Sequence, residues 1–198
     1  MPRDNLLCMT PGRWPRAGLT ALGPTGHRAA LAAAGLFLGG VLTVGCGVTP
    51  AQPAAADLRT SEPPWDAPRD AVSYIDKAGF ERLPLDFSGP SPYTLKISVT
   101  VDGKPVQVPA GIGVDRLRAE QAAVHTHTAD GVVWVEAKSA ADRPTLSQFF
   151  TLWGLRYTPT CLANACQNLT ITTNNTPTPW NTPLLPNAHL TITVRNQR

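Results

Sequence analysis

Two histidines separated by one residue, His125-Thr126-His127, form the pattern in this chain whose residue types and spacing could do chemistry. Residues i and i+2 of a β-strand project from the same face, so both imidazoles could hold one metal ion. Imidazole nitrogens suit Zn and Cu. Because zinc sites commonly use three or four protein ligands, Glu136, Asp130 or His189 would have to complete the set. The same pair also fits a polar outer face without metal, or acid–base chemistry.

A β-hairpin over residues 122–137 must position these histidines. Asp130-Gly131 is a typical two-residue hairpin loop. With that loop, His127 lies opposite Trp134 and His125 lies opposite Glu136, so the four side chains share one face. Valines line the other face, which is expected to form part of the core: Val124, Val133 and Val135.

Other elements follow from alternation and capping. Residues 93–101 alternate apolar and polar positions, and Asp102-Gly103 predicts a second hairpin that returns through Val108. A helix is predicted over residues 70–79, with Gly79 as its stop. A second helix is predicted from Thr145 to Trp153, with Gln148 closing a capping box and Gly154 ending the helix. Its apolar stripe is expected to be buried: Leu146, Phe149, Phe150 and Trp153.

Two further strands, 169–173 and 189–194, close the pattern. The expected fold class is therefore α+β: a β-rich single domain with two hairpins, one buried helix and two C-terminal strands. This order is β-grasp-like, a mixed sheet wrapped around one helix, and a small β-sandwich is the alternative. The domain is expected to span residues 70–198, with the helix at 70–79 and the β-rich core at 93–198.

The four cysteines fit an exported protein. Cys8 belongs to the predicted leader and Cys46 follows an apolar run, which leaves Cys161 and Cys166 as an even pair. In an oxidising compartment that pair is expected to form a disulfide. Its spacing is not the C-x-x-C spacing of redox motifs.

The N-terminal 45 residues resemble a signal peptide that ends at a bacterial lipobox. Residues 29–45 carry no charge and follow a basic stretch, and Val44-Gly45 precede Cys46, although Thr43 stands where a lipobox prefers Leu. We expect Cys46 to be lipidated and the chain to be held on the extracytoplasmic face of the cell membrane. A single uncleaved span and plain secretion are the alternatives. Translation starts at Met1 or at Met9.

Residues 46–69 are rich in Pro and Ala and poor in large apolar residues, so they are predicted to form a tether. The net charge of +3 belongs to the leader, since the rest of the chain carries equal numbers of basic and acidic residues. No basic cluster with interleaved aromatics is present, so nucleic acid is not an expected partner. The sequence contains no Gly-rich phosphate loop, H-E-x-x-H or G-x-S-x-G motif.

These observations favour a lipid-anchored binding or cell-envelope accessory module without catalytic activity. Its expected partners are the membrane and a protein of the cell envelope, and no cofactor is required. The alternative is an extracytoplasmic Zn- or Cu-binding protein that uses His125 and His127, with Glu136 or His189 as a further ligand. An enzyme with another kind of site is the third hypothesis.

The chain also resembles a family of uncharacterised exported bacterial proteins of actinobacterial type. The resemblance covers most of residues 70–198 and is carried by VDGKPVQVPAGIGV, VHTHTADGVVWVEA, TLSQFFTLWG and LPNAHLTITV. Members place several alternating histidines in their first strand. Here that strand reads TLKISVT, with Thr94, Lys96 and Ser98 at those positions. If the family's histidines form a metal site, this chain keeps about half of it. The resemblance implies an exported protein and no specific activity.

Overall fold

The computed structural model describes residues 57–196. The predicted leader, Cys46 and residues 46–56 of the predicted tether lie outside the described residues. The described part contains helices α1 (Ala71–Lys77) and α2 (Leu146–Leu152). Its larger sheet consists of β2 (Tyr93–Val101), β3 (Lys104–Val106), β6 (Val124–His125), β7 (Val132–Val135), β8 (Gln167–Thr173), β9 (Thr176–Pro177) and β10 (His189–Arg195). A small second sheet consists of β1 (Leu83–Pro84), β4 (Val114–Asp115) and β5 (Glu120–Gln121).

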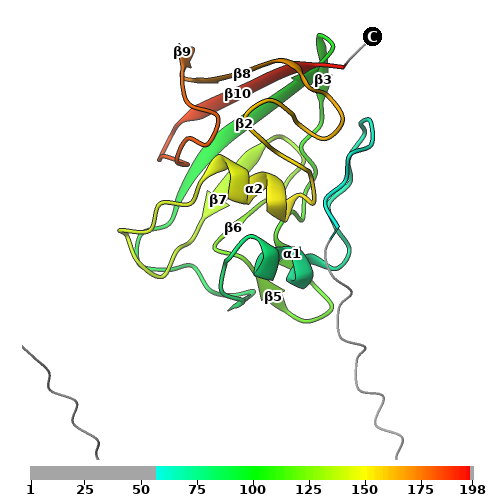
Figure 1. The fold of residues 1–198 in the computed structure, drawn as a ribbon. Coiled ribbons are helices and arrows are strands. Elements are labelled where there is room, and N and C mark those ends of the chain that lie inside the picture. Colours follow the sequence, from blue (N-terminus) through cyan, green and yellow to red (C-terminus); the bar gives the residue numbers. More distant parts are fainter. Residues whose placement is uncertain (1–56, 197–198) are drawn as a thin grey trace, which may run out of the picture. The chain divides into compact units, whose positions relative to one another are not determined.

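The strand order of the larger sheet confirms the α+β, β-grasp-like prediction. The strands follow the order β6-β7-β2-β10-β8-β9, with β3 paired to β2. The central neighbours β2 and β10 are parallel, and every other pair in the sheet is antiparallel. Helix α2 lies in the chain between β7 and β8, over one face of the sheet (Figure 1). The protein is therefore a mixed sheet covered by a helix, and the sandwich alternative does not apply.

Strand β2 forms as its alternation predicts. Its side chains at Leu95, Ile97, Val99 and Val101 are all buried, and the intervening positions are half-buried or exposed. Asp102 and Gly103 both have positive φ values, 50° and 77°. That pair of conformations is typical of the tight turn that suits the twist of a hairpin. Val101 pairs with Lys104 across this turn, as expected for a two-residue loop.

Helix α2 also forms as predicted. The Gln148 side chain accepts a hydrogen bond from the Thr145 backbone N–H at 3.0 Å, which completes the capping box. At the other end, Gly154 has a φ of 72° and the Leu155 N–H donates to the Phe150 carbonyl at 2.9 Å. This is the Schellman arrangement that ends many helices. The stripe of four large side chains is fully buried: Leu146, Phe149, Phe150 and Trp153.

Residues 57–69 correct the tether prediction, because this segment packs on the domain. Trp65 is 2% exposed, and its ring meets that of Trp153 edge to face, with centroids 5.9 Å apart. The Trp153 indole N–H donates to the Trp65 carbonyl at 2.9 Å. Arg59 forms a β-bridge with Leu155. Composition predicted that residues 57–69 would not pack on the domain, because one tryptophan changes the average hydropathy of the segment little. The Trp65 side chain nevertheless supplies a large apolar surface to bury.

Candidate functional site

Strands β6 and β7 position the predicted histidine cluster. His125 is the last residue of β6, pairs with Trp134 of β7, and is fully buried. Its Nδ1 lies 2.9 Å from the Ala122 carbonyl oxygen. A carbonyl oxygen only accepts hydrogen bonds, so Nδ1 carries the proton. In the neutral imidazole, Nε2 is then the atom with the free lone pair.

His127 provides the second imidazole of the cluster. Its Nε2 lies 3.1 Å from Nε2 of His125, and the two rings are nearly perpendicular, at 77°. The His127 ring also meets Trp134 edge to face, with centroids 5.5 Å apart. His127 is exposed, whereas His125 is buried. The pair therefore connects the interior to the solvent.

Glu136 is the third polar side chain of the cluster. It is 9% exposed, and its Oε2 lies 3.6 Å from Nε2 of His125. The same Oε2 accepts a hydrogen bond from Nε2 of Gln121 at 3.2 Å. Gln121 is anchored in turn, because its Nε2 also donates to the Phe87 carbonyl at 2.9 Å. These contacts fix the Glu136 carboxylate at the edge of the histidine pair.

Burial dominates the electrostatics of His125. It lowers the pKa of the imidazole to about 4, and the neighbouring His127 contributes to the same direction. The hydrogen bond to the Ala122 carbonyl opposes this shift, because it favours the protonated ring. At neutral pH His125 is therefore uncharged and keeps its Nε2 lone pair.

The predicted register of the second hairpin is wrong by two residues. His125 lies opposite Trp134, where the sequence predicted His127. The loop is longer than Asp130-Gly131 because Thr126 leaves the ladder: its N–H donates to the Ile112 carbonyl and its hydroxyl donates to the Pro109 carbonyl. A shift of two residues keeps each side chain on its original face. The four polar and aromatic residues consequently still meet, and the three predicted valines are buried in the core.

His189 is not part of this cluster. It begins β10, and its Nε2 lies 2.9 Å from the Ser98 hydroxyl of β2. Strand β2 separates β10 from β7, so His189 is two strands away from Trp134 and its neighbours. Asp130 is engaged in its own turn, where it accepts hydrogen bonds from Thr128 and Val132. Within residues 57–196, no group of three or more His, Cys, Asp or Glu side chains is arranged to hold a metal ion.

Sequence reasoning missed Gln121 and the Ala122 carbonyl, which orient Glu136 and His125. Gln121 lies in the two-residue strand β5, between an irregular loop and the hairpin, so no periodicity identified it. A backbone carbonyl leaves no signal in the residue type. The partners that orient a site are thus the part that sequence patterns do not reveal.

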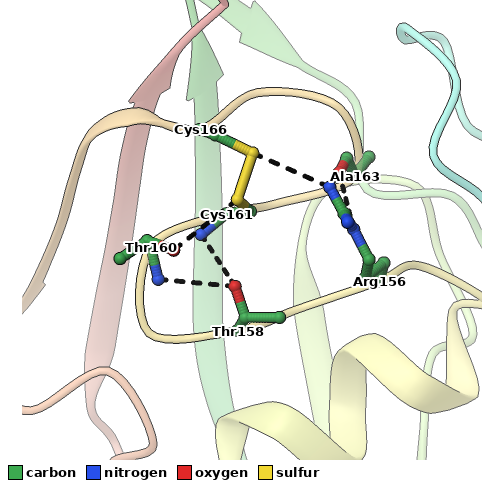
Figure 2. The surroundings of a disulfide bond; sticks show 6 residues. All are labelled: Arg156, Thr158, Thr160, Cys161, Ala163 and Cys166. Carbon is green, nitrogen blue, oxygen red and sulfur yellow. Dashed lines mark hydrogen bonds between the residues drawn. A yellow bond between two sulfur atoms is a disulfide. The ribbon is translucent and has the colours of Figure 1, made fainter.

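The predicted disulfide between Cys161 and Cys166 is present. It closes a loop next to α2, and Figure 2 shows the Arg156 side chain reaching across that loop. Nη2 of Arg156 donates to the Ala163 carbonyl at 2.9 Å and approaches the sulfur of Cys166 at 3.7 Å. The Cys161 N–H donates to the Thr158 hydroxyl at 3.0 Å. The loop is therefore held by hydrogen bonds as well as by the covalent link.

A cleft lies between the segment after α1 and the loop that follows β7. It has a volume of about 320 Å³ and combines the apolar side chain of Phe80 with the charged side chains of Glu81, Lys138 and Arg143. Lys138 and Glu81 form an ion pair at 2.6 Å across it. A concave surface with an apolar wall and a few polar groups is the usual form of a ligand or partner site.

Among the described residues, neither helix has the length and apolar character needed to cross a bilayer. Comparisons with protein families, with curated proteins and with solved structures find no match to this chain.

Proposed function

We propose that the chain is a lipid-anchored module on the extracytoplasmic face of the cell membrane, where it binds a cell-envelope partner and catalyses no reaction. The observation that carries the proposal is the Cys161–Cys166 disulfide, because disulfides persist in oxidising compartments outside the cytosol. The uncharged segment 29–45 followed by Cys46 supports export and lipidation.

The cleft beside Phe80 and Arg143 supports a binding role. Its rim offers both charge signs, which suits a polar segment of another protein that brings a few apolar side chains. The sequence also lacks the common catalytic templates, which favours binding over catalysis. A lipid anchor would keep the module at the membrane, since each buried methylene of an acyl chain contributes about 0.8 kcal/mol.

Fractionation of cells that express the chain tests the anchor. We expect the wild-type protein in the membrane fraction, labelled by a clickable fatty-acid analogue. Cys46→Ser should remove the label, because the thiol that would carry the lipid is gone. Cys8→Ser is the matched control, because it replaces a cysteine of the predicted leader and should leave label and fractionation unchanged.

Two outcomes would contradict lipid anchoring. If the Cys46→Ser protein stays in the membrane without label and the wild-type protein also carries none, the N-terminal segment acts as an uncleaved span. If both proteins are soluble outside the cell, the chain is secreted.

A further inference from the structure

We propose that His125 and His127 are the two protein ligands of one divalent transition-metal ion, with Cu²⁺ bound most tightly, and that Glu136 holds a water molecule on that ion. This site does not depend on the anchor or on the partner proposed above. It uses side chains that the proposed function leaves unexplained.

The spacing of the two ligand atoms fits one shared ion. The Nε2 atoms are 3.1 Å apart. Metal–nitrogen bonds of about 2.05 Å to both atoms would subtend an angle of about 98° at the ion. That angle lies between the right angle of a tetragonal copper site and the tetrahedral angle preferred by zinc. An ion can therefore occupy the site with small movements of the exposed His127 ring.

The tautomer of His125 is already the one that a metal requires. Its Nδ1–H donates to the Ala122 carbonyl, so Nε2 presents its lone pair towards His127. A backbone carbonyl on the second ring nitrogen is one of the partners that orient a metal-bound histidine. Without metal, the short contact is a hydrogen bond in which Nε2–H of His127 donates to Nε2 of His125. Metal binding needs only that His127 carry its proton on Nδ1 instead.

Glu136 supplies a negative charge where the ion would bring a positive one. Its Oε2 is 3.6 Å from Nε2 of His125 and is held by Gln121, so it is placed beside the ion. From there it can accept a hydrogen bond from a metal-bound water. The exposed His127 leaves the remaining coordination positions to solvent, which suits an ion with two protein ligands and bound water.

Copper is expected to bind more tightly than zinc. For a given set of nitrogen and oxygen ligands, divalent first-row metals follow an order of affinity that peaks at Cu²⁺. Two cis imidazoles also match the tetragonal geometry of Cu²⁺, whereas zinc commonly takes a further protein ligand.

The test is a metal titration of the full chain, purified from an oxidising compartment, with Cu²⁺ or Zn²⁺ alone as the probe. His27 of the leader is replaced by Ala in every sample, so that this histidine contributes nothing. We expect one Cu²⁺ per chain after dialysis, and quenching of Trp134 fluorescence that is lost in Trp134→Phe. Glu136→Gln should weaken binding by about 10- to 100-fold. His127→Ala should weaken it more, because it removes a ligand.

His189→Ala is the matched control, since His189 belongs to the same sheet but lies outside the cluster. It should bind Cu²⁺ like the wild-type chain. His127 is exposed, so its replacement leaves the core intact and keeps the test interpretable. Equal Cu²⁺ binding by the wild-type chain and His127→Ala would overturn the proposal, and so would a wild-type chain that retains no ion. Neither result bears on membrane anchoring, which the Cys46 experiment decides separately.

Discussion

His125 is a titratable residue whose chemical surroundings differ strongly from water. Its side chain is fully buried, and its nearest polar atoms are those of Ala122, His127 and Glu136. Burial penalises the charged imidazolium more than the hydrogen bond to the Ala122 carbonyl favours it. His125 is consequently a neutral hydrogen-bonding group in the folded protein and a titrating group in the unfolded chain.

We predict that the free energy of unfolding decreases as the pH falls from about 6.5 to about 4. The folded pKa of His125 is lowered to about 4 from an ordinary value of 6.5. The unfolded chain therefore binds the proton first, and acid favours unfolding. The full effect is about 3 kcal/mol, at about 1.4 kcal/mol per pKa unit. Urea unfolding at pH 7, 5.5 and 4 measures it.

A His125→Asn variant supplies the control for this pH dependence. It keeps a polar side chain in the site but does not titrate, so its stability should change little between pH 6.5 and 4. Asp76 and Asp130, whose pKa values are lowered by hydrogen bonds from Arg82 and Thr128, would act only at lower pH. If the free energy of unfolding changed equally with pH in the wild type and in the variant, His125 would not titrate as described.

At the scale of elements, both helices end on a glycine in the left-handed region. Gly79 follows α1 with a φ of 76°, and Gly154 follows α2 with a φ of 72°. Gly154 is also tightly enclosed, since a Cβ there would lie 3.0 Å from the Tyr74 ring and 3.1 Å from Pro68. This glycine allows α2 to end directly against α1 and the segment that precedes it.

We predict that Gly154→Ala destabilises the protein more than Gly103→Ala. Both positions have positive φ values, which cost about 1–2 kcal/mol for a residue with a Cβ. A Cβ at Gly103 meets open space, however, whereas a Cβ at Gly154 meets Tyr74 and Pro68. Chemical denaturation gives the free energy of unfolding of each variant. The difference between the two values is the cost of the steric contacts with Tyr74 and Pro68 alone. Equal losses would mean that Tyr74 and Pro68 move aside freely.

Local signals predicted most elements, and non-local contacts account for the errors. Capping residues predicted α2, and alternation predicted β2 and β10, because these features are set within a few neighbouring residues. The register of the second hairpin depends on hydrogen bonds between Thr126 and the loop at Pro109–Ile112, which lie far away in the sequence. Clustering of the two histidines with Glu136 was still predicted, since strand alternation alone decides which face they share.

At the scale of the whole domain, residues 57–69 form part of the fold. Trp65 packs beside Trp153, and the Arg59 backbone forms hydrogen bonds with the backbone of Gly154 and of Arg156. The domain boundary therefore lies before Arg59, and earlier than the composition of the chain suggests.

We predict that Trp65→Ala lowers the free energy of unfolding by about 3–5 kcal/mol, the usual range for a fully buried large aromatic side chain. A chain that begins at Asp70 should be destabilised at least as much, whereas one that begins at residue 57 should match the full chain. Thermal and urea unfolding of these variants provide the measurement. A chain beginning at Asp70 with unchanged stability would place the boundary after Trp65.

The parallel pairing of β2 with β10 has a consequence for biosynthesis. Strand β10 follows every other described element in the chain, yet it lies at the centre of the sheet between β2 and β8. Its buried side chains, Leu190, Ile192 and Val194, belong to the same hydrophobic core as the apolar stripe of α2. The ribosome must therefore release nearly all of residues 57–195 before the sheet can close. Such a chain cannot complete its fold while it is being made, and a polypeptide that has not yet folded is the form that threads through a narrow export channel.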